Sequence, residues 1–139
     1  MSLPVDGAEV TFDSLNLHPD LLRGIHDLGF TRPTPIQAQA IPAVLAGRDV
    51  IGCAQTGTGK TAAFVLPILN RLLRHHKGRG NMRALIIAPT RELALQSMTH
   101  VKALSRYVHL KGAAIFGGVP MPPQITALRQ GVDLVSATP

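Results

Sequence analysis

The chain has 139 residues, 45% of them hydrophobic and 16% charged, which is enough for one globular domain with a single core. No apolar run is longer than that at residues 62–66, which is far too short to cross a bilayer, and the first ten residues lack the basic start of a signal peptide. A single cysteine, Cys53, excludes an internal disulfide. We therefore expect a protein of the reducing cytoplasm, with Cys53 as a small core residue.

The formal net charge is +6, from 14 Lys and Arg against 8 Asp and Glu. A basic domain favours a polyanionic partner such as nucleic acid. Much of the excess, however, lies around two glycines between residues 71 and 83, and such a cluster is more typical of a solvated loop than of a binding groove. The basic residues of this cluster are Arg71, Arg74, Lys77, Arg79 and Arg83.

Two helices are predicted before the first strand. Pro19 stands at the first position of one helix, and Gly29 is its stop signal. Thr34 is the expected N-cap of the other helix, with Pro35 at its first position. The residues of the first helix that are expected to face the core are Leu21, Leu22, Ile25 and Leu28.

From residue 49 onward, strand and helix signals alternate. We expect strands over residues 49–53, 84–88, 113–116 and 133–136, and helices over residues 60–74, 92–107 and around 125–128. The continuous apolar run at 84–88 is typical of a strand buried on both faces. The helix after it should bury Leu93, Ser97, Val101 and Leu104. This alternation predicts an α/β fold with a mostly parallel sheet and helices on both faces.

Residues 54–61 read Ala-Gln-Thr-Gly-Thr-Gly-Lys-Thr, a phosphate-binding loop between a predicted strand and a helix. Gly57 and Gly59 let the backbone turn so that its N–H groups approach phosphate oxygens at a helix start. Lys60 is placed to reach the β and γ phosphates, and the Thr61 hydroxyl to bind Mg²⁺. The loop begins with Ala54, where the generic pattern has Gly. A flexible turn with an exposed lysine is the alternative, which the strand–helix context disfavours.

Further segments, in the same order along the chain, resemble the motifs of DEAD-box RNA helicases. The matching segments are residues 29–37 with Phe12 upstream (the Q-motif), 54–61 (motif I, including its initial Ala), 88–94 (motif Ia), the doublet Gly117–Gly118, and 137–139 (the start of motif Ib). Together they cover the chain from Phe12 to its end and are far more specific than any one of them alone.

The resemblance implies a RecA-like P-loop NTPase fold, a three-layer α/β sandwich with a mostly parallel sheet. It divides the chain into an N-terminal tail (1–11), a helical Q-motif region (12–48) and the first part of a RecA-like ATP-binding domain (49–139). The Asp-Glu-Ala-Asp motif of the family and its second RecA-like domain do not occur in this sequence. The separate Ser-Ala-Thr motif of the family is also absent, because the triplet at residues 136–138 overlaps the segment that resembles the start of motif Ib. We therefore expect an incomplete first domain, nearly inert as an ATPase by itself, from a helicase that is active when complete.

The resemblance also implies ATP or ADP as the ligand, together with Mg²⁺. Gln37 would hold the adenine through its amide, which has a donor and an acceptor. Phe12 and Phe30 would pack on or beside the base, and the backbone near Arg32 would accept from the adenine amino group. The residues implied to contact the nucleotide are Phe12, Phe30, Arg32, Gln37, Ala54, Gln55, Thr56, Gly57, Thr58, Gly59, Lys60 and Thr61; Lys60 and Thr61 are also the implied catalytic residues, and Thr61 the metal ligand.

The implied partners are RNA and a second RecA-like domain, with no membrane. Contacts to the sugar-phosphate chain carry little base information, so RNA binding should be largely independent of sequence. The residues implied to line the RNA path are Pro89, Thr90, Arg91, Gly117, Gly118 and Thr138.

Plainer interpretations of these residues remain open at this point. Gln37 could be a polar position on a capped helix, Phe12 and Phe30 could belong to the core, and Arg91 could pair with the neighbouring glutamate. Another P-loop enzyme, such as a GTPase, is disfavoured because no Asn-Lys-x-Asp segment occurs. A non-enzymatic module that binds nucleotide or RNA is the other alternative. The six histidines lack metal-ligand spacing, so no zinc site is expected.

Overall fold

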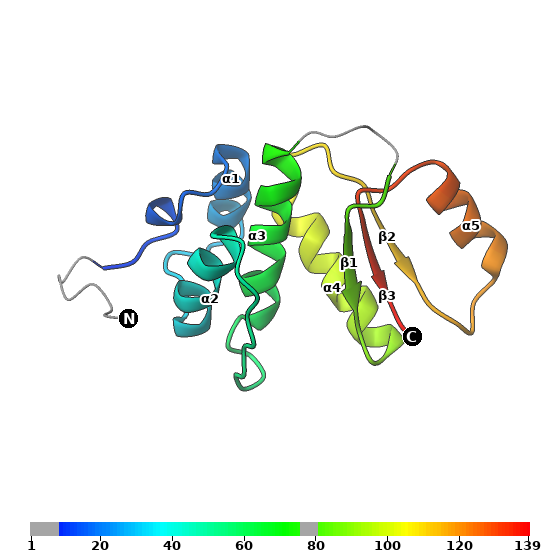
Figure 1. The fold of residues 1–139 in the computed structure, drawn as a ribbon, viewed down its shortest axis with the longest axis horizontal. Coiled ribbons are helices and arrows are strands. Elements are labelled where there is room, and N and C mark those ends of the chain that lie inside the picture. The colour runs from blue at the N-terminus through cyan, green and yellow to red at the C-terminus, as the bar shows by residue number, and fades with distance from the viewer. Residues whose placement is uncertain (1–8, 76–80) are drawn as a thin grey trace.

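The computed structural model describes residues 9–75 and 81–139, which form an α/β structure (Figure 1). Most of the expected tail, residues 1–8, and two members of the basic cluster, Lys77 and Arg79, lie outside the described residues. The elements in chain order are η1 (Asp13–Leu15), α1 (Pro19–Asp27), α2 (Pro35–Leu45), α3 (Lys60–Arg74), β1 (Ala84–Ile87), α4 (Arg91–Leu104), β2 (Gly112–Ile115), α5 (Met121–Arg129) and β3 (Leu134–Ala137).

The three strands form one parallel sheet in the order β1-β3-β2. Leu134 of the central strand is in register with Ala84 on one side and with Gly112 on the other. Because the strands are parallel, all three end at the same edge of the sheet, which is the lower edge in Figure 1. The predicted α/β class and parallel sheet are confirmed.

One hydrophobic core lies between the helices α1 to α4 and one face of the sheet. Helix α3 packs against α1, α2 and α4, and its side chains Val65, Leu66 and Leu69 are fully buried. Helix α4 lies across the sheet so closely that a Cβ built on Gly112 would stand 2.8 Å from the Met98 sulfur. The core therefore ties the helix that follows the phosphate-binding loop to the face of the sheet.

The helices before the sheet begin and end where the sequence predicts. Helix α1 starts at Pro19, and Gly29 follows it with a positive φ of 74°. Helix α2 starts at Pro35 with Thr34 as its N-cap. Leu28, however, is 42% exposed, because it is the C-cap residue of α1 and lies beyond the last buried turn.

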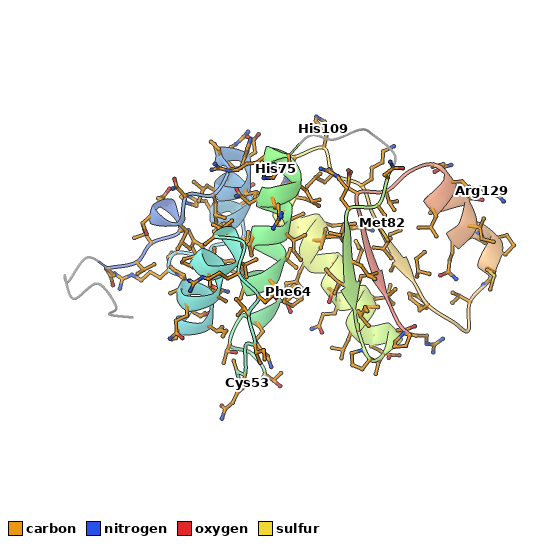
Figure 2. The ribbon with its side chains drawn as sticks, in the orientation of Figure 1. Cys53, Phe64, His75, Met82, His109 and Arg129 are labelled. Atoms are coloured by element: carbon orange, nitrogen blue, oxygen red, sulfur yellow. The ribbon has the colours of Figure 1, made fainter. Side chains whose placement is uncertain are left out.

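The strand predicted over residues 49–53 does not form. No described strand pairs with this segment, and Ile51 is 96% exposed. Cys53, expected in the core, is also exposed and lies in the loop below α3 (Figure 2). Apolar β-branched residues favour a strand, but a strand needs neighbours to satisfy its backbone groups, and the edges of the described sheet lie elsewhere.

Strand β1 is buried on one face only, contrary to the prediction for residues 84–88. Ile86 points toward α4 and is 8% exposed, whereas Leu85 and Ile87 are 51% and 68% exposed. Within the described residues, α5 contacts the sheet at β2 and leaves this face of β1 uncovered. In α4 the predicted core residue Leu93 is exposed and Ala94 is buried instead, so the buried stripe is rotated by one residue near the helix start.

No helix in residues 9–75 and 81–139 has the length and apolar character that crossing a membrane requires.

Candidate nucleotide and RNA sites

The phosphate-binding loop leads directly into α3. Gly57 and Gly59 have φ values of 83° and 80°, in the left-handed region that glycine adopts without steric cost. Gly59 is the N-cap of α3, so the free N–H groups of the first helical turn and the positive end of the helix dipole are presented here. The backbone therefore has the conformations and the polarity that an anionic phosphate requires.

The side chains of the loop hydrogen-bond within the loop itself. Lys60 donates from its ammonium group to the carbonyl oxygen of Ala54, and the Thr58 hydroxyl donates to the carbonyl of Gln55 at 2.6 Å. Thr61 follows on the first turn of α3 and is half-buried. The Lys60 ammonium group has three N–H donors, so two remain for a phosphate group beside the bond to the Ala54 carbonyl.

Gln37 joins the helix α2 to the phosphate-binding loop. Its Oε1 accepts a hydrogen bond from the Thr34 backbone N–H at 3.0 Å, and its Nε2 donates to the Gly59 carbonyl oxygen at 3.1 Å. The residue is only 3% exposed. The Thr34 hydroxyl oxygen beside it is buried without a hydrogen-bond partner in the described residues. The structure thus brings Gln37 into contact with Gly59 of the phosphate-binding loop, 22 residues further along the chain.

The two phenylalanines of the expected base site differ in exposure. Phe12 is 1% exposed and belongs to the hydrophobic core, whereas Phe30 is 37% exposed. Their rings stack, with centroids 6.4 Å apart and planes inclined by 24°. Arg32 lies nearby on the surface and pairs with the carboxylate of Glu9. Phe12 therefore supports Phe30 from the core side, and only the Phe30 ring offers a face to a ligand.

The residues predicted to line an RNA path gather at the ends of the strands. Pro89 and Thr90 follow β1, Gly117 and Gly118 follow β2, and Thr138 follows β3. The Thr138 N–H donates to the Ile115 carbonyl at 3.1 Å, which fixes the end of β3 to the end of β2.

Arg91 spans two of these segments. A Cβ built on Gly118, whose φ is 80°, would stand 2.8 Å from Nη1 of Arg91, so the guanidinium group lies against the glycine doublet. Among the ion pairs of the described residues, none joins Arg91 to Glu92. Thr90 caps α4 by accepting from the Leu93 N–H at 3.3 Å. The segment after β1 and the glycine doublet after β2 are thus in contact through the Arg91 side chain.

Sequence reasoning missed a buried polar link at the opposite edge of the sheet. Arg83 donates to the Asp133 carboxylate at 2.8 Å and to the carbonyl oxygens of Leu72 and His75 at 3.0 Å and 2.7 Å. Both charged side chains are about four-fifths buried. Arg83, assigned above to a basic loop cluster, is therefore a structural residue that holds the end of α3 to the sheet. Arg83 and Asp133 directly precede β1 and β3, and the parallel register was the signal that could have paired them.

The pKa of Asp133 reflects this link. Partial burial by itself would raise the pKa, but the hydrogen bonds from the Lys111 backbone N–H and from Arg83 outweigh burial. Together with the positive charges of Arg83 and Lys111, they hold the pKa of the Asp133 carboxyl below its ordinary value of 3.8.

A second cluster missed by the sequence lies on the surface between α1 and the end of α4. Tyr107 donates its hydroxyl hydrogen to Asp27, and this hydrogen bond raises the pKa of the phenol. Arg23 stacks over the Tyr107 ring with its guanidinium carbon 4.0 Å from the centroid.

The described residues contain no group of three or more His, Cys, Asp or Glu side chains placed to hold a metal ion. The magnesium ligand expected from the sequence is the hydroxyl of Thr61, which does not belong to these residue types.

Comparison with known proteins gives one consistent result. A family model described as DEAD/DEAH box helicase matches residues 34–139. The ATP-dependent RNA helicase SrmB of Escherichia coli (strain K12) is 50% identical over 129 residues, which are 92% of this chain and 29% of SrmB. The ATP-dependent RNA helicase RhlB of Xanthomonas oryzae pv. oryzae is 47% identical over 135 residues, which are 94% of this chain and 24% of that protein.

A solved structure agrees with these sequences. The crystal structure of a DEAD box protein from the hyperthermophile Methanococcus jannaschii matches with a TM-score of 0.83 and 37% identity, over 92% of this chain and 34% of that one. The chain thus spans about a quarter of the length of the curated relatives given above. Because the family model covers most of the chain and a solved member has the same fold, the chain belongs to the DEAD/DEAH box helicase family.

Proposed function

We propose that this chain is the N-terminal part of the first RecA-like domain of an ATP-dependent RNA helicase, and that it binds an adenine nucleotide between the Q-motif and the P-loop. The hydrogen bond from Gln37 to the Gly59 carbonyl is the observation that carries the proposal. It joins the side chain that would recognise the base to the loop that would hold the phosphates, so both parts of one ligand site already form a single unit.

The phosphate end of the site uses backbone groups first. Gly57 and Gly59 turn the chain so that its N–H groups, with the first N–H groups of α3, surround the phosphate oxygens. Lys60 would donate its remaining N–H groups to the phosphates, and the Thr61 hydroxyl would hold Mg²⁺. Bound there, Mg²⁺ supplies positive charge that neutralises the phosphate oxygens. The remaining loop residues, Gln55, Thr56 and Thr58, shape the turn.

The base end of the site depends on the spare capacity of the Gln37 amide. A primary amide has two N–H groups and two acceptor lone pairs, and Gln37 uses one N–H and one lone pair within the protein. The other N–H and lone pair match the acceptor and donor on the edge of adenine. Phe30 presents its half-exposed ring beside the base, with Phe12 behind it, and the backbone near Arg32 accepts from the adenine amino group.

The strand ends would hold one strand of RNA through its sugar-phosphate chain. Arg91 contributes charge at the glycine doublet, and small residues there allow close approach of the backbone. In the complete protein a second RecA-like domain would close on this edge, bend the bound strand and separate short duplexes, and ATP hydrolysis would then release the RNA. The residues proposed for this surface are Pro89, Thr90, Arg91, Gly117, Gly118 and Thr138.

This proposal keeps the expected division of the chain, with a Q-motif region at 12–48 and the start of the ATP-binding domain at 49–139. By itself the chain should hydrolyse ATP only very slowly, since the acidic motif and the second domain supply groups that activate water and close the cleft. We also propose a cytoplasmic location.

The first test compares binding of fluorescent ADP and fluorescent GDP to the complete protein and to its Gln37→Ala variant. We expect ADP to bind more tightly than GDP, and the variant to lose this preference. Equal binding of the two nucleotides by the unmodified protein would overturn the adenine site while leaving a P-loop nucleotide site in place.

The second test measures ATP hydrolysis with and without single-stranded RNA. We expect RNA to stimulate hydrolysis, and Lys60→Ala to abolish it while the circular dichroism spectrum stays unchanged. An active Lys60→Ala enzyme would contradict the phosphate site. Nucleotide binding without any RNA-stimulated hydrolysis would favour the non-enzymatic module instead.

A further inference from the structure

The outer edge of β2 carries backbone groups that point away from the sheet. In the described sheet β2 pairs with β3 alone. The N–H groups of Leu134 and Thr138 in and after β3 donate to the carbonyls of Lys111 and Ile115 at 3.2 Å and 3.1 Å. Backbone groups alternate in direction along a strand, so Gly112, Ala114 and Phe116 direct theirs outward.

One of these three outward positions is already paired by a side chain. The Phe116 N–H donates to Oε1 of Gln124 at 2.9 Å, and Nε2 of Gln124 donates to the Phe116 carbonyl at 3.1 Å. The amide of Gln124, which comes from α5, thus takes the place of a neighbouring strand. Gly112 and Ala114 have no comparable partner within residues 9–75 and 81–139.

These two residues lie on the floor of a groove between α4 and α5. The groove has a volume of about 370 Å³. Leu95 and Met98 of α4 form one apolar wall, and Ala127 of α5 contributes to the other. β2 is short, at four residues, but it carries no proline, no charged residue and no bulge, three of the features by which sheet edges are protected from pairing. The edge is therefore open, in geometry and in sequence, to a further strand.

The charges around the groove are positive. Lys102 lines it, and Lys111 directly precedes Gly112. Within residues 9–75 and 81–139, no Asp or Glu lines it. The Asp133 carboxylate at this end of β2 already accepts from Arg83 and from the Lys111 backbone N–H. A segment that enters the groove therefore meets uncompensated positive charge, which favours acidic residues.

We propose that the outer edge of β2 binds an extended, acidic segment of a partner protein, which adds a fourth strand to the sheet. The segment makes main-chain hydrogen bonds with Gly112 and Ala114 and ends where Gln124 occupies the edge. Because side chains alternate along a strand, an apolar side chain of the bound segment enters the groove, and a carboxylate of the segment pairs with Lys102. This surface is separate from the strand ends and the phosphate-binding loop, so the proposal does not depend on the proposed nucleotide and RNA sites.

The test uses ¹⁵N-labelled complete protein and two capped peptides, acidic Ac-Val-Glu-Val-Glu-Val-NH₂ and basic Ac-Val-Lys-Val-Lys-Val-NH₂. We expect the acidic peptide to shift the amide resonances of Gly112 and Ala114, and the basic peptide to bind about tenfold more weakly. Ala114→Pro should abolish binding because it removes an outward N–H. Lys102 is exposed on α4, so we expect Lys102→Glu to fold normally. This variant should reverse the preference between the two peptides.

Several outcomes would overturn the proposal. Absence of shifts at Gly112 and Ala114 with either peptide at millimolar concentration would refute strand addition. Equal binding of the two peptides, or an unchanged preference in Lys102→Glu, would refute the acidic character of the partner. Shifts that depend on protein concentration without peptide would identify a second copy as the occupant. Slow hydrogen exchange at Ala114 in the peptide-free complete protein would show that its own chain already covers the edge.

Discussion

Nε2 of Gln37 donates to the carbonyl oxygen of Gly59 at 3.1 Å, and Oε1 of the same side chain accepts from the Thr34 N–H at 3.0 Å. Because both partners belong to the protein backbone, the glutamine has a structural role in addition to its proposed role in recognising adenine. The same contact explains the glycine, because a Cβ at residue 59 would stand 2.3 Å from that nitrogen.

The structural role of Gln37 predicts a loss of stability in its alanine variant. Gln37→Ala removes two hydrogen bonds, which leaves the Thr34 N–H without its partner and the Gly59 carbonyl with the Ala63 N–H alone. We expect the free energy of unfolding to fall by about 1–3 kcal/mol in the absence of nucleotide. Urea unfolding measures this change. Gln39→Ala is the matched control, since Gln39 is exposed on the same helix and should change stability by less than about 0.5 kcal/mol. Equal free energies of unfolding for the Gln37→Ala and Gln39→Ala variants would contradict the structural role of Gln37.

The two glycines of the phosphate-binding loop should differ in their tolerance of alanine. Both have φ near +80°, so alanine at either position costs about 1–2 kcal/mol of backbone strain. A Cβ on Gly57 meets nothing within 4 Å, whereas a Cβ on Gly59 collides with Gln37. Gly59→Ala should therefore lower the free energy of unfolding clearly more than Gly57→Ala. Thermal unfolding of both variants provides the comparison, and equal melting temperatures would mean that the Gln37 side chain moves aside without cost.

Close packing of α1 on α4 predicts a severe effect at Gly24. A Cβ there would stand 2.7 Å from the backbone carbonyl oxygen of Leu104, which cannot move without shifting the end of α4. We expect Gly24→Ala to destabilise the protein by about 1–3 kcal/mol. Gly112→Ala is the control, because its Cβ meets the flexible side chain of Met98 at 2.8 Å, and that thioether can rotate away. Chemical denaturation should separate the two variants, and a smaller loss for Gly24→Ala than for Gly112→Ala would show that the helices are free to move apart.

The lowered pKa of Asp133 predicts how stability depends on pH. A carboxyl group whose pKa is lower in the folded state stabilises that state fully above its unfolded pKa, and the contribution is lost as the pH falls through the folded value. Asp133→Asn should therefore be less stable than the unmodified protein at neutral pH. The difference should shrink below about pH 4 and vanish at still lower pH. Unfolding titrations from pH 7 to pH 2 test this, and a constant difference would show that the Arg83 link acts by hydrogen-bond geometry rather than by charge.

Local signals in the sequence predicted the helices well. Helix α3 has the predicted bounds, Lys60–Arg74, because a glycine precedes it and its apolar residues repeat with helical spacing. The prolines at the starts of α1 and α2 likewise stand where they were expected. Such signals depend on neighbouring residues alone, so they hold whatever surrounds the helix.

Features that depend on distant residues were predicted less well. Residues 49–53 have the composition of a strand, but pairing needs a neighbour that local sequence does not specify. Leu85 and Ile87 look buried in the sequence, yet burial depends on which helices cover the sheet. The motif residues were predicted as a set from their resemblance, and the structure adds contacts between them, such as Arg91 against Gly118, that no spacing along the chain reveals.

The hydrogen bond between Lys60 and the Ala54 carbonyl holds the lysine against its own loop. The ammonium group has three N–H donors, so two remain for a phosphate while the third stays on the carbonyl. The loop thus restricts in advance the rotamers of a long side chain, whose ordering would otherwise oppose binding. The proposed phosphate site is therefore partly preorganised, and nucleotide binding would lose less conformational entropy at Lys60 than it would with a freely rotating side chain.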